Sequence, residues 1–359
     1  MKILKALLMS ALVAPFMSSC VNDGNSYSGF SAVYSNGINY ANTTKGYIMF
    51  NSYGNWQLTQ GSGNDWCSFD RTQGSANTVY TIPVTYRQNT SGTSRTAAIR
   101  LQDVDESDAY VTFNLAQCAT RGDGSLGNAK QVKSITGDDG SSIIISYDDV
   151  YRPSSFKMTK EDNTLSDLTF NFATDTVLYV TPAGSGDRLW GKYDNGYQVT
   201  SLTSTTDTVG YHSEGSLGST MAYNLEQHKK GGEYTAQGIL LSASIPTPDS
   251  EAKFDSVRYL HNYADGTPQY VERMKPVYST NSNRNQSVDV NQLVLGVEEC
   301  NPYALLSVFR LVRSSSIMSE AKTANGSFVI ATTLNADKSV STMTVTNKSG
   351  GKVTYTFTY

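Results

Sequence analysis

The sequence predicts an all-β protein with two domains: an antiparallel β-sandwich, then a curved antiparallel sheet or partial barrel that carries one buried helix. Three observations lead to this prediction. Short runs of alternating apolar and polar residues, separated by turn residues, occupy most of the 359 positions. Tyr occurs 23 times beside many Ser, Thr, Asn and Gly, a mixture suited to exposed strands. Only one segment, near residue 300, has the end signals of a buried helix.

The first 20 residues have the pattern of a signal peptide. Two lysines precede an apolar stretch, Ala6 to Met17, which is too short to span a bilayer as a helix. A pair of serines then leads directly into Cys20, and this junction resembles the lipobox of bacterial lipoproteins. The resemblance implies that Cys20 is lipidated and becomes the mature N-terminus of an outer-membrane lipoprotein, facing either the surface or the periplasm. The alternative is a plain signal peptide with a coincidental cysteine.

Residues 21–30 are polar and predict a flexible tether. The net charge of −4 and the lack of a basic stripe argue against a nucleic-acid partner. Only three histidines and no C-x-x-C spacing are present, so we expect no metal and no cofactor.

Residues 31–119 predict the sandwich. The run KGYIMFNSYGNWQL predicts a strand, a Gly-Asn turn and a new strand that begins at Trp56. In TVYTIPVTYRQNTSGTSRTAAIRL two strands flank a polar loop, and alternation places one set of residues on a common face of the first strand: Tyr80, Ile82, Val84 and Tyr86. The stretch AYVTFNLAQ alternates again. Several short strands at this spacing are typical of an antiparallel sandwich.

These residues resemble a BACON domain, a family named for Bacteroidetes-associated carbohydrate binding and an often N-terminal position. The resemblance covers about Ser31 to Ala119 and is carried by Trp56, by Trp66 followed by Gly74, and by the TIPVTYRQNTSGTSRTAAIRL and VTFNLAQ runs. It implies an immunoglobulin-like sandwich on an exported protein of the Bacteroidetes, commonly one that handles glycans. Three more residues fall where the family places them: Asn89, Arg95 and Gln117.

Exposed aromatic side chains are candidate glycan contacts, because aromatic faces pack on the apolar faces of sugar rings. We expect Trp56 and Trp66 in the core. The predicted contacts are therefore Tyr53, Tyr86 and, in the second domain, Trp190.

Two further features of the first domain have competing interpretations. The acidic run DVDESD, residues 103–108, is expected to be a solvated hairpin loop, because it lacks the spacing of a calcium loop. Cys67 and Cys118 form a disulfide if the compartment is oxidising. Alternatively, both are buried thiols that act as small apolar groups.

The stretch TRGDGSLGNAK, residues 120–130, predicts a Gly-rich interdomain linker that proteases cut between Thr120 and Asn128. It contains Arg121-Gly122-Asp123, an adhesion tripeptide. We interpret the tripeptide as a coincidence of common linker residues.

Residues 131–359 contain an internal repeat. YDDVYRPSSF, from Tyr147, aligns with YDNGYQVTSL, from Tyr193, and looser copies start at Tyr263 and Leu334. Each unit predicts a strand, a tight turn and the return strand, so the domain is expected to be a meander of hairpins. Alternating strands also occur in outer-membrane barrels, but the lipobox and the Thr-rich second face favour the curved sheet.

The segment CNPYALLSVFRLVRSSS predicts a buried helix over residues 302–313, with Asn301 as the cap. This half of the chain resembles a Bacteroidetes lipoprotein family of unknown function with a porin-like fold. The likeness is carried by the Tyr-Asp turns, the NQLVLGVEECNPYALLSVFRLV insertion and the terminal VTYTFTY strand. It implies a strongly curved antiparallel sheet or partial barrel and no known activity.

No catalytic motif is present. The sequence has no G-x-S-x-G, P-loop or H-E-x-x-H pattern, and its adjacent Asp pairs lie in predicted turns. We therefore expect a lipid-anchored, non-catalytic protein that binds glycans or mucin at the cell envelope. The alternative is a structural or protein-interaction lipoprotein that partners an outer-membrane assembly.

Overall fold

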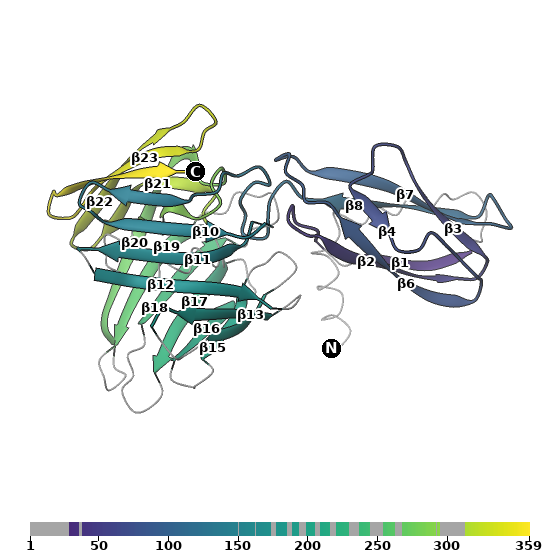
Figure 1. Ribbon diagram of the computed structural model, residues 1–359, viewed down its shortest axis with the longest axis horizontal. Helices are drawn as coiled ribbons and strands as arrows, with labels where there is room; N and C mark the ends of the chain where they lie inside the picture. Colours follow the sequence, from purple (N-terminus) through teal and green to yellow (C-terminus); the bar gives the residue numbers. More distant parts are fainter. Residues whose placement is uncertain are drawn as a thin grey trace, which may run out of the picture. The chain divides into compact units, whose positions relative to one another are not determined.

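The computed structural model describes residues 29–35, 38–149, 151–161, 163–173, 177–184, 189–193, 199–204, 209–215, 220–229, 237–244, 254–262, 268–291, 293–294 and 313–359. Between residues 199 and 273 it describes the strands and their pairing, without side chains. The chain divides between Ala119 and Thr120 into two compact units (Figure 1).

The first unit is a sandwich of two four-stranded antiparallel sheets, ordered β1-β2-β6-β4 and β5-β3-β7-β8. Its strands are β1 (Phe30–Ser35), β2 (Lys45–Ser52), β3 (Trp56–Gln60), β4 (Cys67–Phe69), β5 (Gln73–Gly74), β6 (Thr78–Tyr86), β7 (Arg95–Asp103) and β8 (Tyr110–Gln117). The sequence placed the start of this unit at residue 31, whereas β1 already begins at Phe30, which is buried. β2 and β3 follow one another in the chain but belong to opposite sheets.

Aromatic side chains from both sheets fill the core of the sandwich. The Trp56 ring on β3 lies 5.0 Å from the Phe50 ring on β2 and 4.9 Å from the Tyr80 ring on β6, both in edge-to-face geometry. Trp56 is fully buried and Trp66 is 5% exposed, so the expectation that both are core residues is confirmed. The predicted inward face of β6 is also confirmed, because every second residue from Tyr80 to Tyr86 is buried.

The second unit is a closed ring of antiparallel strands from β9 to β24, completed where β24 pairs with β9 (Figure 1). The strands are β9 (Ser134–Gly137), β10 (Ser142–Tyr147), β11 (Pro153–Lys160), β12 (Asn163–Phe172), β13 (Val177–Pro182), β14 (Leu189–Tyr193), β15 (Val199–Ser204), β16 (Val209–Gly215), β17 (Thr220–Lys229), β18 (Gln237–Ser244), β19 (Phe254–Asn262), β20 (Pro268–Ser282), β21 (Ser316–Thr323), β22 (Gly326–Leu334), β23 (Val340–Thr346) and β24 (Lys352–Thr358). The predicted curvature therefore continues to closure.

The internal repeat corresponds to hairpins of one design. In each, the last residue of one strand pairs with the residue six positions later: Tyr147 with Pro153, Tyr193 with Val199, Asn262 with Pro268 and Leu334 with Val340. A register irregularity occurs at the same step in all four. The repeated sequence thus encodes a shared loop length and bulge.

The two faces of the described barrel wall differ in chemistry. Aliphatic and aromatic residues fill the inner face, such as Ile143, Phe156, Met343 and Tyr355. On the outer face, seven neighbouring strands from β22 through β24 and β9 to β12 each place a hydroxyl residue in one row: Thr333, Thr342, Thr356, Thr136, Ser142, Thr159 and Thr164. Threonine suits such a surface, because β-branched side chains favour the strand and hydroxyls pair across it.

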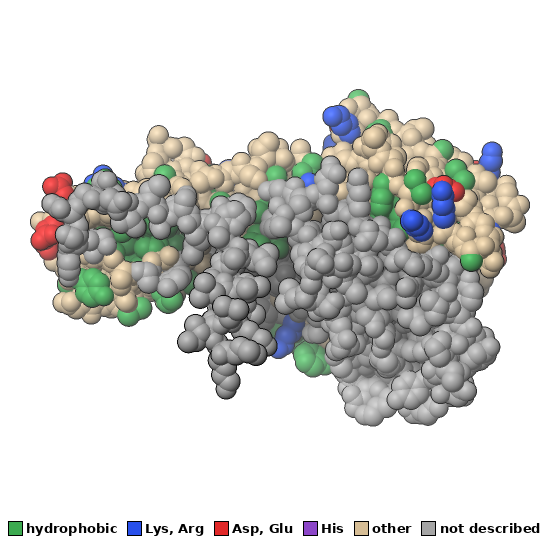
Figure 2. Space-filling model, turned by 180° about the vertical axis from the view of Figure 1, so that it is seen from behind, with side chains coloured by type: hydrophobic (Ala, Val, Ile, Leu, Met, Phe, Trp, Pro, Cys, Tyr) green, Lys and Arg blue, Asp and Glu red, His purple; other side chains and the backbone are tan. Residues whose placement is uncertain are grey.

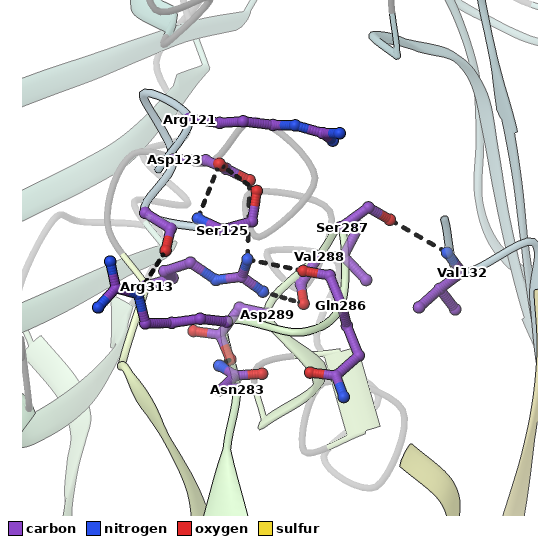
Figure 3. A network of polar contacts seen from close by, with 12 residues as sticks. Arg121, Asp123, Ser125, Val132, Asn283, Gln286, Ser287, Val288, Asp289 and Arg313 are labelled. Carbon is purple, nitrogen blue, oxygen red and sulfur yellow. Dashed lines mark hydrogen bonds and ion pairs between the residues drawn. The ribbon is translucent and has the colours of Figure 1, made fainter. Parts of the chain in front are cut away.

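Residues 120–125 are not a flexible linker, which corrects the prediction. Thr120, Arg121, Asp123 and Ser125 are all at most 3% exposed. Asp123 accepts hydrogen bonds from the backbone and hydroxyl of Ser125, and its carboxylate lies 3.8 Å from the guanidinium of Arg313 (Figure 3). The Gly-rich, polar composition of this segment predicted a mobile linker. Residues far away in the sequence, such as Arg313, instead pack around it and bury it. The adhesion tripeptide is therefore inaccessible at both charged positions.

Arg313 joins this segment to the loop that follows β20. Its guanidinium donates to the carbonyl oxygens of Gln286, at 2.8 Å, and Val288 (Figure 3). In the same network, Asp289 accepts from the amide of Asn283 at 2.8 Å, and burial raises the pKa of its carboxyl. Lys130 continues the contact through a backbone hydrogen bond to Asn285. These bonds fix residues 120–130 to the barrel.

The predicted helix over 302–313 lies outside the described residues, except for Arg313. In the part of the chain that is described, no helix is long and apolar enough to cross a membrane.

Candidate functional site

A row of exposed side chains runs along β2 on the outer face of the first sheet. Period-two alternation points Ile48, Phe50 and Ser52 inward, where they are buried. The alternate residues Tyr47, Met49 and Asn51 face outward, and Tyr53, directly after the strand, continues the row. Tyr47 is 42% and Tyr53 48% exposed. Since outward neighbours on a strand are about 7 Å apart, this β2 row extends over about 20 Å.

β6 adds apolar and hydroxyl groups beside the β2 row. Pro83 pairs with Tyr47, Thr81 with Met49, and Val79 with Asn51, and all three β6 residues are exposed. On the other side, the Tyr53 hydroxyl lies 3.3 Å from the Ser31 hydroxyl, which also accepts the Asn51 amide at 3.3 Å. The surface thus combines two aromatic rings, apolar patches and an oriented amide. Figure 2 shows hydrophobic side chains on the surface of this unit.

The three predicted contact residues separate in the structure. Tyr53 lies in the β2 row. Trp190 is 40% exposed on β14 of the second unit. Tyr86 is only 2% exposed and stacks on Trp66 in the core, with ring centroids 6.1 Å apart, so its predicted role as a glycan contact is wrong. Burial also raises the pKa of Tyr86. It is the last inward residue of β6, so the alternation of the strand buries it.

Hydrogen bonds among three polar residues, Asn89, Arg95 and Gln117, close one end of the sandwich. Asn89 is 1% exposed and donates to the carbonyls of Thr93 at 2.7 Å and Cys118 at 2.9 Å. The Arg95 guanidinium lies 4.6 Å from the Trp66 ring and donates to the Gln117 amide oxygen. Gln117 in turn donates to the carbonyls of the loop before β2. These contacts indicate that Asn89, Arg95 and Gln117 stabilise the fold.

Cys67 and Cys118 do not form the predicted disulfide, and both are thiols. Cys67 is buried beside β6, and burial raises the pKa of its thiol to about 11. The alternative interpretation, a small buried apolar group, therefore applies to Cys67.

The acidic loop is held by its own hydrogen bonds. Asp103 is buried and accepts from the backbone of Asp105 at 2.8 Å and of Glu106 at 3.2 Å. Asp105 accepts from the Asn55 amide at 2.9 Å. Among the residues whose placement is described, no group of three acidic, His or Cys side chains could hold a metal ion.

The outer face of the second sheet has a different chemistry, which the sequence interpretation missed. Gln73, Gln57, Gln102 and Tyr110 lie directly opposite one another across β5, β3, β7 and β8. In the neighbouring row, Arg100 is flanked by Thr59 and Thr112. We call these seven residues the amide face. The Arg100 guanidinium lies 3.8 Å from the Tyr110 ring, and Ser107 O accepts from Arg100 at 3.4 Å and Gln102 at 3.0 Å.

Comparison with known proteins identifies part of this unit. Residues 55–116 match the BACON family. The family is described as "Putative binding domain, N-terminal". The matched residues include all seven residues of the amide face, whereas Tyr47 and Tyr53 precede them. No curated protein matches the chain.

Two solved structures are similar to the chain, and each is described as a porin-like protein. One, from Bacteroides uniformis ATCC 8492, has 10% identity and a TM-score of 0.44, over 63% of this chain and 97% of that one. The other, from Bacteroides vulgatus ATCC 8482, has 11% identity and a TM-score of 0.36, over 64% and 98%.

Proposed function

We propose that the protein is a non-catalytic glycan-binding lipoprotein of the cell envelope, anchored through Cys20 to the outer membrane of a member of the Bacteroidetes. The β2 row is the observation that supports binding. Its two tyrosines offer flat apolar faces for sugar rings, and the Asn51 amide between them offers its carbonyl oxygen and its second N–H to hydroxyls. The match of the adjoining residues to a family described as a binding domain supports the same unit as the binding module.

A protein partner is the second candidate. Met49 is 36% and Val79 64% exposed in the same surface, and contiguous apolar side chains of this kind also suit a protein interface. The proposed occupant in that case is a component of an outer-membrane assembly.

The test is a glycan array with the chain from Val21 onward, followed by calorimetry on each hit at millimolar sugar. Tyr47→Ala and Tyr53→Ala should each weaken binding of a hit without changing the melting temperature. Tyr151→Ala is the matched control, because Tyr151 is a 38% exposed tyrosine of the second unit.

The outcomes separate the candidates. Loss of binding in Trp190→Ala alone would move the site to the second unit. Failure of polysaccharides and mucin glycans to bind would eliminate glycan binding and leave the protein partner. Mass spectrometry of the native N-terminal peptide tests the anchor, and an unmodified Cys20 would refute it.

A further inference from the structure

We propose that the amide face of the first unit binds an acidic sugar, with Arg100 holding the sugar carboxylate. This inference rests on the proposed glycan binding and names a second surface and a ligand class for it.

The positive charge of Arg100 can attract an anionic ligand. Arg100 forms no ion pair within the described part of the chain, whereas Arg87 pairs with Asp65 at 3.0 Å and Arg152 with Asp148 at 2.6 Å. Its single hydrogen bond there is the long one from Nη2 to Ser107 O. The Nη1 group is thus available for an external acceptor.

The carboxylates of the nearby acidic loop do not pair directly with Arg100 in the described structure. Asp103 accepts from its own loop backbone, and Asp105 accepts from Asn55. Glu106 and Asp108 are exposed and form no ion pair with Arg100.

Two contacts orient the guanidinium of Arg100. Tyr110 lies under its plane, and Ser107 O fixes one edge, so the planar fork is held in place before a ligand arrives. A held guanidinium suits a carboxylate, which it binds through two parallel hydrogen bonds. Pre-ordering also lowers the entropy lost on binding.

The neutral amides around Arg100 indicate which class of ligand fits this surface. Gln57 and Gln73 are exposed, and their amides, like that of Gln102, can both donate to and accept from sugar hydroxyls. The strands are about 4.8 Å apart, which spaces these amides evenly beside the cation. One cation among several neutral donors and acceptors matches a sugar that has one carboxylate and several hydroxyls. A nucleic acid or a phosphopeptide would instead require a cluster of cations.

The test uses oligogalacturonate, its methyl ester, and sialyllactose with lactose as the neutral counterpart, each titrated into the chain from Val21 onward. We expect the acids to bind and their neutral counterparts to bind more weakly. Arg100→Gln should weaken the acids about 10- to 100-fold, the factor expected for losing a charged hydrogen-bonded pair, and should leave neutral ligands unchanged. Arg100→Lys should restore only part of the affinity, because an ammonium lacks the fork.

Arg87→Gln is the matched control, since it removes an exposed arginine of the same unit. Unchanged acid binding in Arg100→Gln, equal affinity for acid and ester, or no binding of either acid at millimolar concentration would overturn the proposal. Neutral glycan binding that depends on Tyr47 and Tyr53 would still support the proposed function in each of these cases. Acid binding that depends on Arg100, without any effect of the two tyrosines, would instead refute the β2 row as the site.

Discussion

Replacing Trp56 by alanine tests whether this tryptophan stabilises the fold or binds a ligand. Its ring is fully buried and touches two aromatic rings from the opposite sheet. Truncating a buried tryptophan to alanine costs about 3–5 kcal/mol. Each lost aromatic pair adds about 0.5–1.5 kcal/mol beyond buried area, so we expect a value in the upper part of that range, about 4–5 kcal/mol.

Calorimetric melting of the full chain measures this loss. In a domain of this size 1 kcal/mol changes the melting temperature by about 4–8 °C, so the transition of the first unit should fall by about 16–40 °C or disappear. The transition of the barrel should stay in place, because the two units have separate cores. Tyr53→Ala, on the exposed β2 row, should change stability by less than about 0.5 kcal/mol. A Trp56→Ala variant with an unchanged transition and lost glycan binding would refute the assignment of Trp56 to the core.

Three other predictions concern packing, the buried thiol and the barrel contact. Gly74→Ala should destabilise the first unit by about 1–3 kcal/mol in urea unfolding, because an added Cβ would lie 2.5 Å from the Trp56 ring nitrogen; wild-type stability would contradict this packing. Because burial raises the pKa of Cys67 to about 11, its reaction with a thiol reagent in the native protein should be slow at pH 8 and accelerate toward pH 11, and rapid reaction at pH 7 would exclude a protonated, buried thiol. Arg313→Met should cost the barrel about 3–5 kcal/mol by leaving Asp123 buried without its cation, and trypsin should cut after Arg121 only in this variant; cleavage there in the native chain would contradict the buried network.

Alternation predicted the buried face wherever one face of a strand was clearly more apolar than the other. It placed Tyr80, Ile82 and Val84 of β6 on one face, and the structure buries that face. On β2 it failed to separate the faces, because large side chains occur on both: Tyr47 and Met49 on one, Ile48 and Phe50 on the other. Period-two spacing shows which residues share a face, but burial depends on which sheet packs against it.

Contacts between distant residues account for the other differences. The Gly-rich composition of residues 120–130 predicted a linker, but Asp123 is buried and pairs with Arg313, which comes about two hundred positions later. Closure of the barrel depends on the pairing of its first and last strands. The amide face combines residues from four strands, so its glutamines are scattered in the sequence and form a row only through strand register.

The polar groups on the outer surfaces of the two units differ in whether they already bond to one another, and this difference explains why we assign binding to the first unit. On the barrel, Thr333 bonds to Thr342 at 2.7 Å and Ser142 to Thr159 at 2.8 Å, so these hydroxyls partly satisfy one another. A ligand would have to replace those bonds, and little net free energy would remain. On the amide face, by contrast, Gln57 and Gln73 are exposed and make no side-chain hydrogen bond with other described residues. A sugar can bond to these amides without breaking protein contacts, which favours the sandwich over the barrel wall as the recognition surface.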